Sequence, residues 1–323
     1  MEAVGVDLGG TKMAVGVIEA GEKDGRPAPL VHYRQTERSI GWDEQRVLDE
    51  LAEEIEDALE ARPDAVGVGI GVPATIDRKR GVAIRGVNLS LENVPIRDVL
   101  SKRVPVPVSL DNDANLAALA EHRFGAARGT QVAVLLTLGT GIGGGIIING
   151  ELFRGATGAG AELGHIVVDE NGPPCQGRCP NHGCVETFAS GTALARDGRA
   201  AAERAPDSAL AKLLAAGEEI DGHAVTDAAL AGDEVAGEVV ATAGRHLGVA
   251  LASLANMFEP EVIVIGGGVM AAGEKLLEPA RAELRARALT PMNGTPVVPA
   301  ELGPEAGMIG GAALAMAEAE GEA

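Results

Sequence analysis

All three cysteines of the 323-residue chain fall within one ten-residue stretch, at Cys175, Cys179 and Cys184. His165 precedes this stretch by ten positions and completes a Cys₃His set, a common composition of closed structural zinc sites. The Gly, Pro and Asn residues between the cysteines suit the tight turns that would gather such ligands. His182 is the alternative fourth ligand, but a lone loop histidine is more often solvated, which favours His165. The alternative is three unrelated buried thiols, but the polar, Gly- and Pro-rich character of the stretch argues against it. We therefore expect one structural zinc ion in a cysteine loop that spans residues 165–186.

Two carboxylates flank the expected metal ligands. Glu162 lies three residues before His165, and Glu186 lies two residues after Cys184. A bound metal would hold both carboxylates and one imidazole in a fixed array, and carboxylates pair well with the vicinal hydroxyls of a sugar. His165 could bind zinc through one ring nitrogen and a hydroxyl through the other. The cysteine loop therefore carries the side chains of a sugar-binding site.

A second group of reactive residues ends a predicted strand in the sequence SLDNDANLAALAE, where Asp111, Asn112 and Asp113 stand in a row. Ligands of open α/β sheets usually bind at such strand ends. A carboxylate there can accept the proton of an attacking hydroxyl in phosphoryl transfer, and the amide can bind sugar hydroxyls. The alternative for each residue is a helix N-cap, because Asp and Asn are common just before helices. Asp111 is the most cap-like or structural of the three.

Glycine turns follow three predicted strands. The first, DLGGTK, contains Asp7, Gly9, Gly10, Thr11 and Lys12. Its glycines let backbone N–H groups approach phosphate oxygens, while Thr and Lys add donors and positive charge. Asp7 could orient a magnesium ion through water. A plain β-hairpin is an equally good alternative for this turn, because Gly-Gly is common there.

The second turn, LGTGIGGG, includes Thr140 and Gly141, and the third, GGGV, includes Gly267 and Gly268. The glycine spacing of the second turn matches the dinucleotide pattern G-x-G-x-x-G, but that motif requires a following helix. The β-branched sequence GIIING that follows favours a strand instead, which argues against dinucleotide binding. The P-loop pattern G-x-x-x-x-G-K-[ST] is absent from the sequence. Three glycine turns at strand ends, two of them with threonine, favour a nucleotide held between two domains.

The elements that must position these residues form a repeated pattern. A strand, a glycine turn and another strand occur near the N-terminus and again from about Gln131, which predicts two related α/β halves around a central cleft. We expect an N-terminal domain over residues 1–114 and a larger C-terminal domain over residues 115–304. Helical spacing follows Trp42, and a small-residue helix over about residues 305–319 can return to the first domain.

Composition excludes two classes of partner. The net charge of −20 disfavours nucleic acid and anionic membranes, and an aromatic content of 2% leaves few base-stacking side chains. The N-terminal sequence lacks a basic region followed by a cleavable apolar segment, so we expect no signal peptide. The most apolar stretch, residues 132–148, is interrupted by glycines and is short for a membrane span. These features predict a cytoplasmic protein.

The motifs together resemble the ROK family (repressors, open reading frames and sugar kinases), and within it the bacterial glucokinases. The resemblance covers nearly the whole chain in order, through DLGGTK, GIGVPATID, DNDANLAALAE, LGTGIGGG, GAGAELGH, the cysteine loop with GCVETFASG, PEVIVIGGGV and GMIGGAALA. It implies an actin-like (ribonuclease H-like) fold whose two domains close around ATP and a hexose. The implied reaction is ATP-dependent phosphorylation of D-glucose at its 6-hydroxyl, with magnesium as the metal partner of ATP.

The resemblance also implies roles for individual residues. Asp113 matches the general base that contacts and deprotonates the sugar hydroxyl. The implied glucose contacts are Asn112, Glu162, His165 and Glu186. The implied phosphate contacts are Gly9, Gly10, Thr11, Lys12, Thr140 and Gly141, and Gly267 and Gly268 fall where adenosine is held. The implied zinc ligands are His165, Cys175, Cys179 and Cys184, and the family implies a homodimer or homotetramer.

Two departures from the family pattern concern the sites. The commonest pattern is C-x-C-G-x-x-G-C, whereas here Cys175 lies two residues earlier, Gly177 occupies the place of the first cysteine, and Pro180 replaces a glycine. We therefore expect a reshaped loop around the same metal. Ala74 replaces a glycine near the expected sugar pocket, which keeps another hexose open as substrate, such as N-acetylmannosamine, fructose or a β-glucoside. A non-catalytic sugar-binding regulator is a further alternative, and polyphosphate is the alternative donor to ATP.

Overall fold

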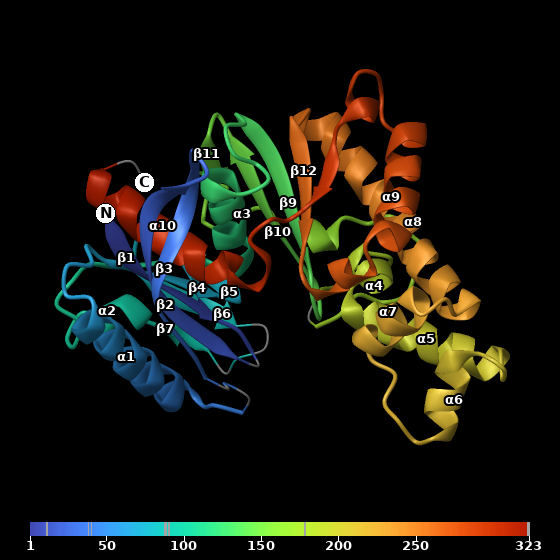
Figure 1. Ribbon diagram of the computed structural model, residues 1–323, viewed down its shortest axis with the longest axis horizontal. Helices are drawn as coiled ribbons and strands as arrows, with labels where there is room; N and C mark the ends of the chain where they lie inside the picture. Colours follow the sequence, from blue (N-terminus) through green and yellow to red (C-terminus); the bar gives the residue numbers. More distant parts are fainter. Residues whose placement is uncertain are drawn as a thin grey trace. The chain divides into compact units, whose positions relative to one another are not determined.

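The computed structural model describes residues 1–10, 12–37, 39, 41–86, 89, 91–177 and 179–321. Contacts divide the chain into two compact units (Figure 1). The first unit contains Met1–Gln131, Gly145–Ala161 and Ala300–Ala323. The second unit contains Val132–Gly144 and Glu162–Pro299.

A five-stranded mixed sheet forms the centre of the first unit. Its strands lie in the order β3 (Arg26–Glu37), β2 (Met13–Lys23), β1 (Glu2–Leu8), β4 (Val68–Val72) and β8 (Val108–Asn112). β1 pairs antiparallel with β2 and parallel with β4, and β4 pairs parallel with β8. Parallel strands have their carboxyl ends at one edge of a sheet, so Asp7 and Asn112 both lie at that edge.

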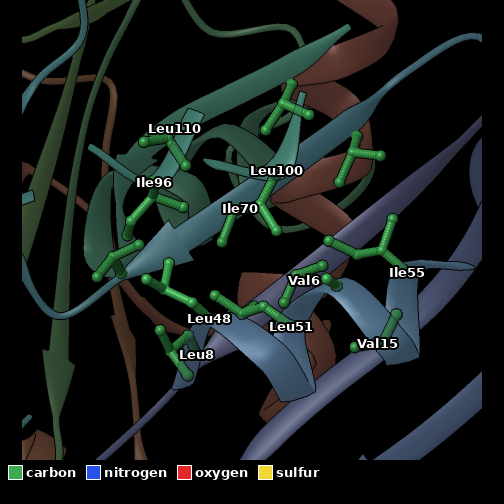
Figure 2. Packing of buried hydrophobic residues seen from close by; sticks show 14 of the residues in the cluster. Val6, Leu8, Val15, Leu48, Leu51, Ile55, Ile70, Ile96, Leu100 and Leu110 are labelled. Atoms are coloured by element: carbon green, nitrogen blue, oxygen red, sulfur yellow. The ribbon is translucent and has the colours of Figure 1, made fainter. Parts of the chain in front are cut away.

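Helix α1 covers the first sheet with the apolar side that the sequence predicts after Trp42. It spans Glu44–Ala61, and the carboxylate of Asp43 caps it by accepting a hydrogen bond from the N–H of Arg46. Figure 2 shows how the helix and the sheet share one core. Its labelled side chains are Val6, Leu8, Val15, Leu48, Leu51, Ile55, Ile70, Ile96, Leu100 and Leu110.

The predicted C-terminal helix is α10 (Ala306–Glu320), which belongs to the first unit and contacts β1, β4 and α3 (Asp113–Phe124). Its small residues permit this packing, because a side chain on Gly311 would collide with the backbone of Gly69 in β4. Since α3 and α10 are in contact, residues 115–131 fall in the first unit. The sequence-based boundary after residue 114 had placed them in the second domain.

Smaller elements complete the first unit. They are the sheet of β5 (Ala74–Asp77), β6 (Val82–Gly86) and β7 (Glu92–Val94), the helices α2 (Ile96–Leu100) and η4 (Gly303–Glu305), and β11 (Glu151–Phe153). β11 pairs antiparallel with β10 (Ile142–Ile148). The second five-stranded sheet has the order β11-β10-β9-β12-β13, and the boundary between the units falls within β10.

In the second unit, β9 (Val132–Leu138), β12 (Val262–Gly266) and β13 (Val297–Pro299) pair parallel to one another. The sequence also predicts one long helix over most of residues 233–258, and this helix is α8 (Glu234–Phe258). The other helices are α4 (Glu186–Ala189), α5 (Gly191–Arg204), α6 (Ala209–Ala215), α7 (Gly222–Leu230), α9 (Glu274–Arg287), η1 (Leu163–His165), η2 (Gly268–Ala272) and η3 (Met292–Gly294). No helix within the described ranges has both the length and the hydrophobicity that a membrane span needs.

Candidate functional site

The cysteine loop brings its four predicted metal ligands together. The ligand atoms of His165, Cys175, Cys179 and Cys184 all lie within 4.8 Å of one another. Nδ1 of His165 lies 3.4 Å from Sγ of Cys175, and the Sγ atoms of Cys179 and Cys184 are 3.9 Å apart. Tetrahedral zinc with Zn–S distances of about 2.3 Å separates its sulfur ligands by about 3.8 Å. The donor set and its spacing are therefore compatible with zinc.

Without a metal, the surroundings of Cys175 and Cys184 disfavour their thiolate forms. Burial raises the pKa of the Cys175 and Cys184 thiols, and the neighbouring thiols raise the pKa of Cys175 further. Zinc binds thiolates, so a divalent ion at this point would offset the cost of ionising three crowded sulfurs. The rival ligand His182 is exposed and lies outside the cluster, with Nδ1 3.4 Å from the carbonyl oxygen of Gly172. The geometry supports His165 as the fourth ligand.

Gly177 explains how the wide spacing between Cys175 and Cys179 still closes on one point. Its φ of +62° is left-handed, a conformation that glycine adopts without steric cost. This turn returns the chain so that the N–H of Cys179 faces the carbonyl of Gln176 at 3.4 Å. The N–H of Cys175 donates to the carbonyl of Asn181 at 2.9 Å, which ties the two sides of the loop together. The turn at Gly177 and the bond between Cys175 and Asn181 accompany the convergence of the two cysteines.

Glu186 connects the cysteine loop to the second glycine turn. Its Oε2 accepts a hydrogen bond from the backbone N–H of Ile142 at 2.7 Å. The approach is so close that a side chain on Gly141 would collide with the Glu186 carboxylate. A larger residue at position 141 would therefore displace the Glu186 carboxylate from its present position.

Two further bonds hold this turn, and neither was expected from the sequence. The N–H of Gly191 donates to the carbonyl of Gly139 at 2.8 Å, and the hydroxyl of Thr192 donates to the carbonyl of Thr140 at 2.8 Å. Both donors lie at the start of α5, where the side chain of Ser190 is the N-cap. Ser and Gly at the start of a helix indicate a cap, but these residue types do not indicate that the start of α5 would bind the second glycine turn.

The third glycine turn lies beside the second because it follows β12, which is parallel to β9. Gly267 has a φ of +88°, and a side chain on it would collide with the backbone of Leu138 at the end of β9. Gly268 lies next to His223 of α7, whose Cε1 would be 3.5 Å from a Cβ at that position. Thr140, Gly267 and Gly268 are exposed. The structure thus brings together four predicted nucleotide contacts of the second unit, counting Gly141.

In the first unit, Asn112 and Asp113 lie where β8 meets α3. The Asn112 side chain is the N-cap, accepting hydrogen bonds from the N–H groups of Ala114 at 3.0 Å and Asn115 at 3.3 Å. The capping alternative is therefore confirmed for Asn112. Asp113 is the first helical residue and accepts from the N–H of Ala114 at 2.9 Å. Burial raises the pKa of the Asp113 carboxyl, against the opposing effect of this backbone hydrogen bond.

Asp7 lies at the same sheet edge as Asp113. Burial and, to a smaller extent, the negative charge of Asp113 raise the pKa of Asp7, Lys12 opposes both effects, and the result is a pKa of about 7. The first glycine turn closes through the N–H of Gly9, which donates to the carbonyl of Lys12 at 2.9 Å. Gly10 is half-buried and Lys12 is exposed, while Thr11 lies outside the described residues. The proximity of two carboxyls favours a cation at this edge.

The remaining predicted sugar contacts belong to the second unit. Glu162 is exposed and precedes η1, and its carbonyl accepts the N–H of His165 at 3.1 Å. Glu186 begins α4 two residues after Cys184. Since Nδ1 of His165 faces the cysteine sulfurs, Nε2 lies on the opposite side of the ring. Each unit therefore carries its own part of the predicted sugar site.

Known proteins of one family are similar to this chain over nearly its whole length. The model of the ROK family matches residues 3–318. The chain is 39% identical to the glucokinase of Thermotoga maritima over 316 residues, which cover 97% of each protein. A crystal structure of a ROK family glucokinase from Streptomyces griseus in complex with glucose and AMPPNP has a TM-score of 0.83 and 36% identity, with 98% of this chain and 99% of that chain covered. A ROK hexokinase from Thermus thermophilus has a TM-score of 0.79 and 36% identity, with coverage of 99% and 100%. These similarities confirm the predicted actin-like α/β fold.

Proposed function

The chain belongs to the ROK family, and we propose that it is a glucokinase, which transfers the γ-phosphoryl group of ATP to the 6-hydroxyl of D-glucose. The observation that carries this proposal is full-length similarity, at 36% identity, to a ROK glucokinase crystallised with glucose and AMPPNP. The arrangement of the predicted residues within each unit is consistent with that reaction.

Asp113 is proposed as the general base. Its position at the first turn of α3 places the carboxylate at the sheet edge where Asp7 also lies, and the preceding N-cap Asn112 fixes the local backbone. A base has to be ionised to accept the proton of the attacking hydroxyl, and a raised pKa increases its proton affinity. Positioning of the reactants and stabilisation of charge supply most of the acceleration in this class of reaction.

The sugar is proposed to contact Asn112, Glu162, His165 and Glu186. With Nδ1 of His165 turned to the cysteines, its Nε2 is the atom available to a sugar hydroxyl. The cysteine loop supports these contacts because Cys184 and Glu186 are only two residues apart. The residues of the Cys₃His cluster would hold a zinc ion, which would stabilise the loop without taking part in the chemistry.

The phosphates of ATP are proposed to lie on the backbone of the glycine turns. Gly9, Gly10, Thr11 and Lys12 would serve from the first unit, and Thr140 and Gly141 from the second, with Gly267 and Gly268 at the adenosine. Asp7 would hold magnesium through water, and a bound magnesium ion neutralises charge on the phosphates. The pKa of Asp7 near 7 suits this role, because a cation would favour the ionised carboxylate.

A second candidate is a ROK kinase of broader hexose specificity. Nδ2 of Asn112 lies 3.5 Å from the carbonyl oxygen of Ala74, so the residue that departs from the family pattern is next to a proposed sugar contact. The ROK hexokinase of Thermus thermophilus is a relative of the same identity, 36%. This alternative shares the phosphoryl chemistry and differs only in the sugar.

The test is a steady-state hexose panel with ATP and magnesium, repeated with polyphosphate as donor. We expect the highest kcat/KM for glucose with ATP, and higher values for other hexoses would favour the broader kinase. Asp113→Asn should abolish turnover while calorimetry still detects glucose binding. Substantial turnover by Asp113→Asn would contradict the assignment of the base. Light scattering of the same samples tests the expected homodimer or homotetramer.

A further inference from the structure

Asp111 is a buried carboxylate that the proposed chemistry does not use. Its residue is 1% exposed, and the N-cap of α3 is Asn112, so Asp111 is not the cap. Oδ2 of Asp111 accepts a hydrogen bond from Nε of Arg154 at 2.7 Å. Oδ1 accepts from Nδ2 of Asn115 at 2.9 Å and from the backbone N–H of Asn112 at 2.8 Å. Three donors to one buried carboxylate hold it in one fixed orientation.

These bonds fix the residues on both sides of the proposed base. The amide of Asn115 donates to Asp111, and the backbone N–H of Asn115 donates to the side chain of Asn112. Asp111, Asn112 and Asn115 therefore form a closed set of hydrogen bonds around the start of α3. Asp113 lies between Asn112 and Asn115 in the sequence, so these hydrogen bonds fix the backbone on both sides of it.

Arg154 extends the same network to the segment that leads to Glu162. Its carbonyl accepts the N–H of Gly160 at 3.0 Å, which closes residues 154–160 into a loop. Gly158 in this loop is so close to the carbonyl of Ile76 that a Cβ would lie 2.6 Å from it. One ion pair therefore connects the start of α3 to the loop before Glu162. Arg78 forms a second, longer ion pair with the same carboxylate, with its Nε 3.7 Å from Oδ2 of Asp111.

We propose that Asp111 and Arg154 are positioning residues of the sugar pocket, holding Asn112 and Asp113 at one end of the ion pair and the segment before Glu162 at the other. Neither residue touches the reacting atoms. This inference rests on the proposed function, because it assigns the sugar contacts to these segments. Small displacements of reacting groups cost large factors in rate, so loss of the pair should lower kcat well before it unfolds the protein.

The test compares Arg154→Met with Arg154→Lys and with the double variant Asp111→Asn/Arg154→Met. Arg154 is replaced first because Asp111 then keeps its two other donors, which favours a folded protein. We expect Arg154→Met to lower kcat about 100-fold and to weaken glucose binding by calorimetry, with the KM for ATP within about twofold. Arg154→Lys should recover part of kcat. The control is Glu56→Gln, which breaks the exposed pair with Arg103 at 2.7 Å and should leave kcat unchanged.

The double variant separates positioning from charge balance. It removes both charges, so it should recover the melting temperature lost in Arg154→Met but not kcat. Recovery of kcat in the double variant would show that the pair serves only to balance charge and would overturn the proposal. Normal kcat in Arg154→Met would overturn it too, while leaving the proposed function intact. A wild-type protein without activity on any hexose would overturn both.

Discussion

The carboxylate of Glu186 accepts a hydrogen bond from the backbone N–H of Ile142 at 2.7 Å. This bond joins a residue two positions beyond the proposed zinc ligand Cys184 to the turn proposed to hold phosphate. If Glu186 also binds the sugar, one side chain touches the loops of both substrates. The structure of the cysteine loop would then influence ATP binding as well as glucose binding.

Two substitutions of Glu186 should separate its two contacts. Glu186→Gln keeps an oxygen that can accept the N–H of Ile142, so it should raise the KM for glucose about tenfold and leave the KM for ATP within about twofold. Glu186→Ala loses the acceptor and should raise both constants. Steady-state kinetics with each substrate varied in turn measures the effect. An unchanged KM for ATP in Glu186→Ala would mean that the bonds from Gly191 and Thr192 hold the turn by themselves.

Metal analysis tests the cysteine loop. We expect about one zinc per purified chain, because four ligands of suitable spacing are present. Cys184→Ser should lose the metal, lower the melting temperature and weaken glucose binding. His182→Ala is the matched control and should keep zinc and activity. A strong chelator should reproduce the effect of Cys184→Ser in the wild type and add nothing in that variant.

The raised pKa of Asp7 predicts how stability without ligands depends on pH. Since the pKa of Asp7 is about 7 when folded and about 3.9 in unfolded chains, the folded state holds this proton more tightly. Protonated Asp7 therefore contributes favourably to the free energy of unfolding below about pH 4, and this contribution is lost as the pH rises to about 7. Asp7→Asn, which cannot ionise, should stabilise the unliganded protein by about 2 to 4 kcal/mol near pH 8 and by much less near pH 4.

Urea titrations at both pH values measure this difference. Asp207→Asn, at an exposed position, is the control for loss of one negative charge. Asp7→Asn should also weaken the dependence of activity on magnesium. Equal stabilisation by Asp7→Asn at both pH values would show that the carboxyl does not titrate in this range.

Ala161, next to the proposed sugar contact Glu162, has a φ of +64°. This left-handed conformation is unfavourable for a residue with a Cβ, so Ala161→Gly should increase the free energy of unfolding by about 1 kcal/mol. Ala282→Gly in the exposed middle of α9 is the matched control and should decrease it by about 1 kcal/mol. Chemical denaturation of both variants checks the opposite signs. Destabilisation by Ala161→Gly would contradict the backbone geometry.

Elements with a clear apolar pattern could be predicted from the sequence. The α1 positions Val47, Leu51 and Ile55 are fully buried, as their spacing indicates, and α8 matches the long helix predicted over most of residues 233–258. The sequence does not predict helix α5, because Leu194 is the one large apolar residue on its buried side and the others, such as Ala193 and Gly198, are small. Pattern reasoning detects large side chains and misses helices that are held by small ones.

For the sites, the sequence predicts which residues take part but not which distant residues they contact. The ligand types at Cys175, Cys179 and Cys184 predicted the metal cluster that the structure brings together, including His165 rather than His182. Their sequence could not show that Gly177 would close the loop. Asp111 was interpreted as cap-like or structural, and its partner Arg154, 43 positions along the chain, was not predicted. Contacts between distant segments depend on how the strands are ordered, which residue types do not reveal.

The position of α10 has a consequence for the order of folding during synthesis. The second unit, apart from Val132–Gly144, is one continuous stretch from Glu162 to Pro299, whereas the first unit needs Ala306–Glu320 to cover β1 and β4. The ribosome completes the second unit before it has made α10. We therefore expect nascent chains to protect the second unit first and to keep part of the first sheet accessible until α10 has been made, which would make that sheet a contact site for chaperones.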